Sequence, residues 1–225
     1  MKMLKTIILI GLTVSGLWAG PERWEKDISR LEESARKNPP PKGGLLFVGS
    51  SSIRLWDLKS AFPERNVINC GFGGSEVEDS IYYADRLVIP HEPRIVFLYA
   101  GDNDIGGGKS AERVVADYRR FVKTIHTALP QTQIVFLPIK PSLARWEKWP
   151  EMNEANQTIK KLSEENPLLH FLDTARPSLA KGEKPDPALF QKDGLHLNTK
   201  GYAVWNKVVR DWLATLKDVA PPSGE

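Results

Sequence analysis

Three short apolar runs, each followed by a segment rich in glycine and small polar residues, constrain the fold of this chain most. The runs are Leu45–Val48, Asn66–Cys70 and Arg94–Ala100, and the polar segments follow at 49–52, 71–75 and 101–104. The first run is apolar at successive positions, which is typical of a strand buried on both faces. We therefore expect buried strands that end in polar loops.

Segments with helical periodicity separate these strands. Apolar residues recur at helical spacing in 21–37, 76–87, 110–129, 152–162 and 199–216, and two more strands are expected at 133–138 and 168–173. Strands that alternate with helices predict a parallel sheet with helices on both faces. The predicted fold class is α/β, a three-layer α/β/α sandwich with a five-stranded parallel sheet. We expect loops over 140–150 and 175–192.

The N-terminus has the pattern of a secretory signal peptide. Lys2 and Lys5 precede a short apolar run, and Ala19 supplies a small residue at which a peptidase can cut. We expect cleavage after Ala19 and a secreted or periplasmic protein without stable membrane insertion; an uncleaved anchor is the alternative. The expected organisation is a signal peptide at 1–19, a helix and linker at 20–43, one main domain at 44–217 and a flexible tail at 218–225. Cys70 is the only cysteine, so no internal disulfide forms.

The charge balance argues against a nucleic-acid partner. Removal of Lys2 and Lys5 leaves 29 basic residues against 28 acidic ones. A protein so close to neutral has no electrostatic footprint for phosphate backbones. Oligomeric state is not predicted.

A serine-rich turn joins the first strand to the helix after it. Ser50, Ser51 and Ser52 follow Gly49 directly, and Ile53 begins the helical stretch. Backbone N–H groups at a helix start have no partner inside the helix and stabilise negative charge, so the turn suits a nucleophile. The alternative is that Ser50 or Ser51 only caps the helix.

A carboxylate and an imidazole lie three residues apart before the last helix, at Asp193 and His196. A serine hydroxyl attacks a carbonyl only when a base takes its proton, and the base works best when a carboxylate orients it. The three other histidines lie at positions that favour structural roles, namely His91, His126 and His170. On spacing alone, a catalytic and a structural role for His196 remain equally open.

An oxyanion site would complete this chemistry. The N–H of Ser51, the N–H of Gly74 and the side-chain amide of Asn103 meet if the three strand-end loops converge. The alternative is that the glycine-rich segments at 71–74 and 101–104 are simply turns.

Together these segments resemble the SGNH hydrolase superfamily, which contains the GDSL esterases and lipases. Its sequence blocks correspond here to Gly49-Ser50-Ser51, to the Asn-Cys-Gly-Phe-Gly-Gly segment at 69–74, to Gly-Asp-Asn-Asp at 101–104 and to Asp-Gly-Leu-His at 193–196. The resemblance implies a flavodoxin-like SGNH hydrolase fold for 44–217. It also implies Ser51 as nucleophile and oxyanion donor, Gly74 and Asn103 as further donors, His196 as base and Asp193 as its partner.

Two residues depart from this pattern. Ser50 stands where the family often has Asp, which leaves open which serine attacks. Asp102 stands where the family often has Thr, and it places a charge near the oxyanion donors.

The expected function is a secreted serine esterase that acts on a small-molecule or polysaccharide ester without metal or cofactor. Secretion and the Trp-bearing loop favour acetyl groups on glycans, with Phe72, Ile105, Trp146 and Trp149 lining the pocket; local packing is the alternative for these residues. Lipid or lysophospholipid esters are the second candidate. A rival of another class is an inactive carbohydrate-binding module on the same fold.

Two other motifs are excluded. The Gly-Gly-Gly-Lys-Ser run at 106–110 lacks the earlier glycine of a phosphate-binding loop, because position 103 is Asn. The Gly-x-Ser-x-Gly elbow of ordinary α/β-hydrolases is absent, because position 53 is Ile.

Overall fold

The computed structural model describes residues 20–181 and 183–216. The predicted signal peptide at 1–19 and the predicted tail at 218–225 lie outside the described residues. Within the described part of the chain, no helix is both long enough and apolar enough to cross a membrane.

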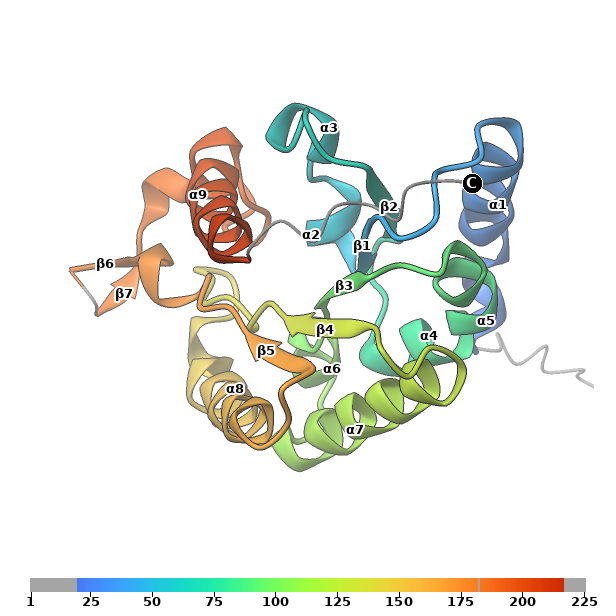
Figure 1. The fold of residues 1–225 in the computed structure, drawn as a ribbon. Coiled ribbons are helices and arrows are strands. Elements are labelled where there is room, and N and C mark those ends of the chain that lie inside the picture. Colours follow the sequence, from blue (N-terminus) through green and yellow to red (C-terminus); the bar gives the residue numbers. More distant parts are fainter. Residues whose placement is uncertain (1–19, 182, 217–225) are drawn as a thin grey trace, which may run out of the picture.

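Five parallel strands form the central sheet, in the order β2-β1-β3-β4-β5. Their bounds are β1 Leu45–Gly49, β2 Val67–Gly71, β3 Ile95–Tyr99, β4 Gln133–Phe136 and β5 Leu169–Phe171. Helices cover both faces (Figure 1). The predicted three-layer α/β/α fold with a five-stranded parallel sheet is therefore confirmed.

The alternation of side chains along β1 and β3 builds two hydrophobic cores, one on each face of the sheet. Leu46 of β1 belongs to the core under one set of helices, whereas Phe47 belongs to the core under the other. The first set comprises α1 (Glu25–Lys37), α4 (Val77–Tyr82), α5 (Ala84–Leu87), α7 (Ala111–Ala128) and α8 (Trp149–Glu164). The second set comprises α2 (Ser51–Arg54), α3 (Leu58–Ala61) and α9 (Thr199–Thr215).

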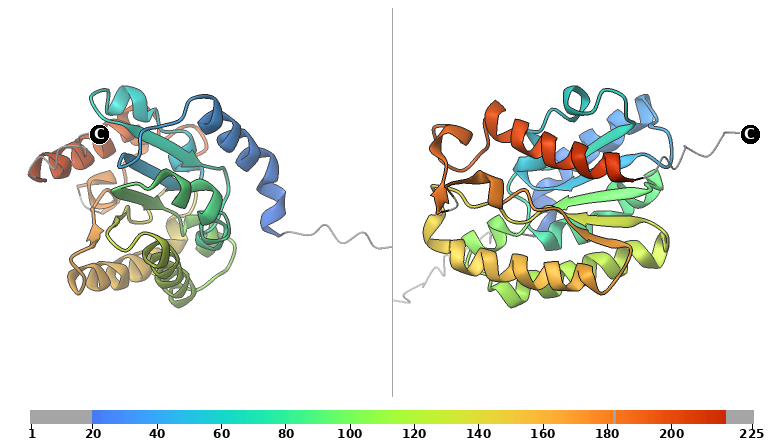
Figure 2. Two further views of the ribbon diagram at one scale, coloured as in Figure 1. Left: turned by 45° about the vertical axis from the view of Figure 1, so that its right-hand side comes forward. Right: turned by 60° about the vertical axis from the view of Figure 1, so that its left-hand side comes forward.

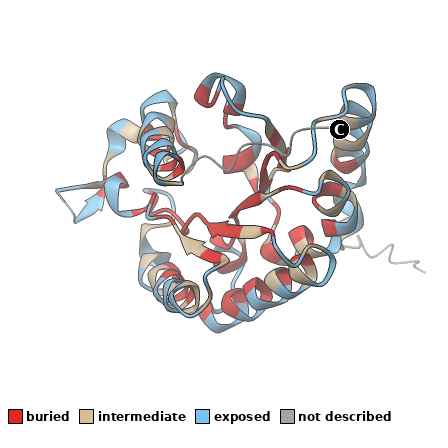
Figure 3. Cartoon of the chain, in the orientation of Figure 1, coloured by how far each residue is buried: buried red, intermediate tan, exposed pale blue. Residues whose placement is uncertain are grey.

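Each long helix turns one face to the sheet and the other to solvent. Figure 2 shows α9 running along one face of the sheet, with α7 and α8 on the opposite face. In Figure 3 the strands are mostly buried, while the helices alternate between buried and exposed residues. Ser110 caps α7 through its hydroxyl, which accepts the N–H of Arg113, as a serine before a helix commonly does.

The prediction of one continuous helix over 76–87 is wrong. The segment is helical, but it is broken at Tyr83 into α4 and α5. Tyr83 is buried against Phe72, and its hydroxyl donates a hydrogen bond to the carbonyl of Pro21. The tertiary contacts of one aromatic side chain thus interrupt a continuous helical pattern.

Two predicted loops contain regular structure. The segment 140–150 holds a 3₁₀ turn at Trp146–Lys148, and α8 already begins at Trp149, with Pro150 in its first turn where proline is tolerated. The segment 175–192 contains a two-stranded antiparallel sheet formed by β6 (Leu179–Ala180) and β7 (Lys184–Pro185).

Candidate active site

The turn between β1 and α2 places Ser51 at the carboxyl edge of the sheet. Gly49 has φ +131°, and a Cβ at this position would lie 1.9 Å from the carbonyl oxygen of Tyr99. Only glycine therefore lets β1 pass this close to the end of β3. The N–H of Ser50 then donates to the same Tyr99 carbonyl, and Ser51 is the first residue of α2.

Asn69 of β2 holds α2 in place. Its side-chain amide donates to the carbonyls of Ile53 and Trp56, at 2.8 and 3.1 Å, and its oxygen accepts the N–H of Gly71. The polar side chain in an otherwise apolar strand thus satisfies backbone groups at the end of the short helix. This fixes the position of Ser51 relative to the sheet.

Ser51, His196 and Asp193 form one hydrogen-bonded chain. His196 Nε2 lies 3.0 Å from Ser51 Oγ, and His196 Nδ1 lies 2.6 Å from Asp193 Oδ2. The side chain of His196 is 25% exposed, so the imidazole is reachable from solvent while one edge stays covered. The arrangement can move a proton from the serine hydroxyl to the imidazole while the carboxylate stabilises the charged ring.

The Asp193 carboxylate is held in its ionised form. The hydrogen bond with His196, followed by those from the backbone N–H groups of Leu195 and His196, lowers the pKa of Asp193 to about 2. Hydrogen bonds to the charged form of a carboxyl always favour that form. Asp193 is therefore an acceptor throughout the neutral pH range.

The loop that carries Asp193 and His196 is anchored at both sides. Asn198 caps α9 with its side-chain oxygen and donates its amide to the carbonyls of Ala188 and Phe190. On the other side, the carbonyl of Gly194 accepts the N–H of Ala144, from the segment that follows β4. These contacts restrain the imidazole independently of Ser51.

The three predicted oxyanion donors lie in the segments that follow β1, β2 and β3 at the carboxyl edge of the sheet. The Asn103 Nδ2 donates to the carbonyl of Ser75 at 2.9 Å, so the third loop contacts the second directly. Gly74 is exposed with φ +77°, and both Ser51 and Asn103 are partly exposed. All three residues are therefore exposed or partly exposed rather than buried in the core.

The charge of Asp102, expected near these donors, is compensated inside the protein. Asp102 is 4% exposed, and its Oδ2 lies 3.2 Å from Nζ of the equally buried Lys140 and accepts the Tyr99 hydroxyl at 3.2 Å. Burial by itself raises the pKa of Asp102, but Lys140 and Arg145 outweigh this and hold it below its usual value. Asp102 is thus an ionised partner of the buried Lys140 and the partly exposed Arg145.

Of the four side chains expected to line a substrate pocket, two lie in the core instead. Phe72 and Ile105 are fully buried; the ring of Phe72 packs edge-on against Trp24 and Tyr83. Both belong to the hydrophobic cluster on the α7 face of the sheet, so the expectation that they line the pocket is wrong. The rings of Trp146 and Trp149 stack at 6.2 Å and stay partly exposed.

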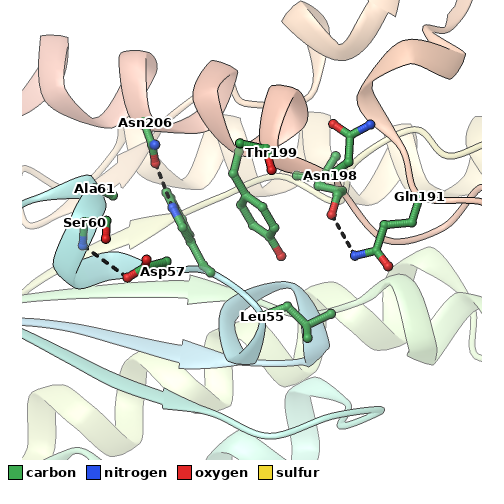
Figure 4. Close-up of a pocket in the computed structure, with 11 residues that line it drawn as sticks. Leu55, Asp57, Ser60, Ala61, Gln191, Asn198, Thr199 and Asn206 are labelled. Atoms are coloured by element: carbon green, nitrogen blue, oxygen red, sulfur yellow. Dashed lines mark hydrogen bonds between the residues drawn. The ribbon is translucent and has the colours of Figure 1, made fainter.

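A pocket of about 530 Å³ lies between the end of α2 and the start of α9, beside the loop of Asp193 and His196. Figure 4 shows Leu55, Asp57 and Ser60 on one side, with Thr199, Asn206 and Gln191 across from them. Leu55 lies one helical turn after Ser51, and its backbone N–H donates to the Ser51 carbonyl. Side chains with amides and hydroxyls share the walls with apolar ones such as Leu55 and Leu197.

Three residues important for the site were not expected from the sequence, namely Tyr99, Lys140 and Arg145. The isolated lysine after the apolar run of β4 was the one available signal.

Two of the other histidines contact structural groups: His126 Nε2 lies beside the Thr132 carbonyl, and His170 Nε2 lies beside the Gln133 side-chain amide. Among residues 20–181 and 183–216, no three His, Cys, Asp or Glu side chains are grouped to hold a metal ion.

Residues 54–204 match the model of the GDSL-like lipase/acylhydrolase family. The chain belongs to this family. It is therefore a carboxylic ester hydrolase, and its resemblance to the SGNH superfamily is confirmed. The matched range contains Asp193 and His196 but begins after Ser51, so the position of the serine rests on the hydrogen-bonded chain described above.

Relatives and solved structures agree with this family assignment. The chain is 22% identical over 219 residues to platelet-activating factor acetylhydrolase IB subunit alpha2 from Gallus gallus, covering 90% of this chain and 88% of the relative. A GDSL-like lipase from Bacteroides thetaiotaomicron has a similar fold (TM-score 0.70, 16% identity, 88% of this chain and 98% of that chain). So does a carbohydrate esterase of family 3 from Talaromyces cellulolyticus (TM-score 0.60, 17% identity, 76% and 96%).

Proposed function

We propose that this GDSL-like hydrolase is an exported serine esterase in which Ser51 is the nucleophile, His196 the base and Asp193 the residue that orients the base. The single observation that carries the proposal is the position of the His196 imidazole, 3.0 Å from the Ser51 hydroxyl on one side and 2.6 Å from the Asp193 carboxylate on the other.

In the first half-reaction Ser51 Oγ attacks the ester carbonyl carbon while His196 Nε2 takes the hydroxyl proton. The negative charge that develops on the carbonyl oxygen is stabilised by the N–H groups of Ser51 and Gly74 and by the Asn103 amide. The charged imidazole then gives its proton to the leaving alkoxide, so the alcohol departs and the acyl group stays on Ser51.

In the second half-reaction water replaces the alcohol. His196 takes a proton from the water as it attacks the acyl carbon, and returns that proton to Ser51 Oγ as the carbon–oxygen bond breaks. The free acid leaves and the serine is restored. The imidazole supplies the activation of both nucleophiles, so the proposed route uses no cofactor.

We favour acetyl groups on glycans as the substrate. The secretory pattern of residues 1–19 and the partly exposed rings of Trp146 and Trp149 support a sugar ester, as do the amides and hydroxyls in the mixed lining of the pocket between α2 and α9. Aromatic rings stack on sugar faces, and amides bond to their hydroxyls. The fold shared with a carbohydrate esterase is consistent with this choice.

A lipid ester is the second candidate, because the relative from Gallus gallus is named as a platelet-activating factor acetylhydrolase. Initial rates on acetylated xylan and on a lysophospholipid discriminate the two. We expect acetate release from xylan to be faster; faster hydrolysis of the lysophospholipid would reverse the order of the candidates.

The assignment of Ser51 is tested with p-nitrophenyl acetate. We expect the wild type to hydrolyse it and Ser51→Ala to lose about 10⁴-fold or more in kcat. Ser50→Ala is the matched control, because the Ser50 hydroxyl is buried without a hydrogen-bond partner. Loss of activity in Ser50→Ala but not in Ser51→Ala would make Ser50 the nucleophile. If wild type and Ser51→Ala are equally inert on short and long esters, the inactive binding module is the better description.

A further inference from the structure

Arg145 binds the side-chain oxygen of Asn103, on the side of the amide away from its donor nitrogen. Its Nη2 donates to Asn103 Oδ1 at 3.0 Å, and its Nη1 donates to the backbone carbonyl of Asp102 at 2.7 Å. Arg145 comes from the loop after β4, whereas Asn103 lies in the short helix α6 (Asp102–Gly106) after β3. The guanidinium therefore joins two loops of the site and contacts one of the proposed oxyanion donors.

The two contacts of Asn103 determine which way its amide faces. The oxygen and nitrogen of an Asn side chain are distinguished by their hydrogen-bond partners. Here Oδ1 meets a guanidinium, which only donates, and Nδ2 meets the Ser75 carbonyl, which only accepts. Rotating the amide by 180° would set donor against donor and acceptor against acceptor, so Arg145 stabilises a single orientation.

The charge of Arg145 also acts on the amide electronically. A hydrogen bond from a cation is stronger than one between neutral groups. The positive charge of the guanidinium that donates to Oδ1 draws electron density away from the amide nitrogen, which makes the Nδ2 protons better donors. One of these protons bonds to Ser75, and the other remains for a developing oxyanion.

Arg145 is itself fixed by the buried ion cluster beneath the site. Its Nη1 lies 3.5 Å from Asp102 Oδ2, which is bound in turn by Lys140 and the Tyr99 hydroxyl. The Arg145 side chain is only 23% exposed, and a Cβ on Gly106 would lie 2.9 Å from its Nε. The guanidinium thus packs closely against α6 and is not a freely moving surface group.

From these contacts we propose that Arg145 is a positioning residue for the ester hydrolysis: it orients and polarises Asn103 as an oxyanion donor, while Asp102, itself bound by Lys140, holds Arg145. This inference rests on the proposed function, because it needs an oxyanion for Asn103 to stabilise. It assigns a use to Asp102, one of the two residues that depart from the family pattern.

A double-mutant cycle between Arg145 and Asn103 tests the inference. We expect Asn103→Ala to lower kcat on p-nitrophenyl acetate about 10²- to 10³-fold. Arg145→Met should lower kcat about 10- to 100-fold, with KM changed less than about threefold, because the transition state alone carries the charge. In the Asn103→Ala background, adding Arg145→Met should lower kcat by less than about threefold more, because the effect of Arg145 passes through the amide that is no longer present.

Two further variants separate positioning from a purely structural role. Arg145→Lys keeps a cation but loses the planar fork, so it should recover part of the kcat lost in Arg145→Met. Arg119→Met, on the exposed side of α7, is the control and should match the wild type. Thermal unfolding of every variant shows whether the chain is folded at the assay temperature.

Either of two results would overturn the inference while leaving the esterase intact. One is that Arg145→Met lowers kcat as much in the Asn103→Ala background as it does in the wild type, which would mean that Arg145 acts independently of the amide. The other is wild-type kcat in a folded Arg145→Met. A wild type that is inert on all esters would instead refute the proposed function, and the role of Arg145 with it.

Discussion

His196 Nε2 lies 3.0 Å from the Ser51 hydroxyl, although 145 residues separate the two in the sequence. The parallel sheet explains the meeting: Ser51 follows β1 at its carboxyl end, and the loop before α9 returns to the same edge. Asp193, three residues before His196, then bonds to the far nitrogen of the ring. The site thus combines a long-range contact, between Ser51 and His196, with a local one, between His196 and Asp193.

Asp193→Asn should lower kcat about 10³- to 10⁴-fold with little change in KM. An amide in place of the carboxylate removes the charge that stabilises the protonated ring and can donate to Nδ1, which favours the wrong tautomer. Steady-state kinetics on p-nitrophenyl acetate measure the effect.

The control for this prediction is Asp186→Asn. Asp186 lies in the same stretch of chain but accepts the N–H of Ala188 and does not contact the imidazole. Its variant should keep wild-type kcat. A kcat for Asp193→Asn within about threefold of wild type would remove Asp193 from the proposed mechanism.

The sequence predicted the sheet and the convergence of its loops because both follow from local patterns. Continuous apolar runs mark buried parallel strands, and the carboxyl ends of such strands share one edge. The residues expected at that edge, Ser51, Asp193 and His196, could be proposed from their positions after the strands and before the last helix. Their mutual distances became visible only in the structure.

Other features depend on where a side chain points, which spacing does not encode. Phe72 and Ile105 stand in the polar segments that follow β2 and β3, next to proposed site residues, yet their side chains turn into the core. Lys140 and Arg145 occur in a loop without periodicity, and their partners Tyr99 and Asp102 lie about 40 residues earlier. No local pattern predicts such long-range pairing of charges.

Lys140→Met should lower the free energy of unfolding by about 3–5 kcal/mol, because it leaves the buried Asp102 carboxylate with only the more distant Arg145 to compensate it. Replacing both residues, as Lys140→Met with Asp102→Leu, should recover much of the loss, since neither fully buried charge is then present and Arg145, which loses its carboxylate partner, is partly exposed. Urea unfolding measures both variants.

Lys207→Met is the matched control for the buried pair. Lys207 pairs with Asp211 on the exposed side of α9, where an ion pair contributes less than about 1 kcal/mol. If Lys140→Met and Lys207→Met lower the free energy of unfolding equally, the buried ion pair of Lys140 does not stabilise the fold more than an exposed one.

Asp104 should make stability fall as the pH rises from about 4 to about 7. Burial raises the pKa of this carboxyl from 3.8 to about 7 in the folded protein, and nearby Lys109 offsets only part of the effect. Between the two values the folded state holds a proton that the unfolded chain has released, so the free energy of unfolding decreases with pH. Below about 4 both states are protonated and this contribution is constant.

The comparison of wild type with Asp104→Asn isolates this effect. Asn keeps an acceptor for the Val77 N–H but does not titrate, so the melting temperature of the variant should decline less between pH 4 and 7. Parallel curves for the two proteins over this range would contradict the raised pKa of Asp104. The control for ordinary acidic groups is Asp211→Asn, whose exposed side chain should leave the slope unchanged.

Trp146 and Ile105, both expected to line the pocket, differ in exposure and should respond differently to substitution. Trp146 is partly exposed, so Trp146→Ala should raise KM for acetylated xylan several-fold while p-nitrophenyl acetate is hydrolysed at nearly the wild-type rate. Ile105→Val, in the core, should instead lower stability by about 0.5–1.5 kcal/mol and leave the ratio of the two activities unchanged. Kinetics on both substrates with melting curves separate these outcomes. An altered ratio in Ile105→Val would place Ile105 at the substrate after all, and an unaltered ratio in Trp146→Ala would remove the tryptophan from glycan binding.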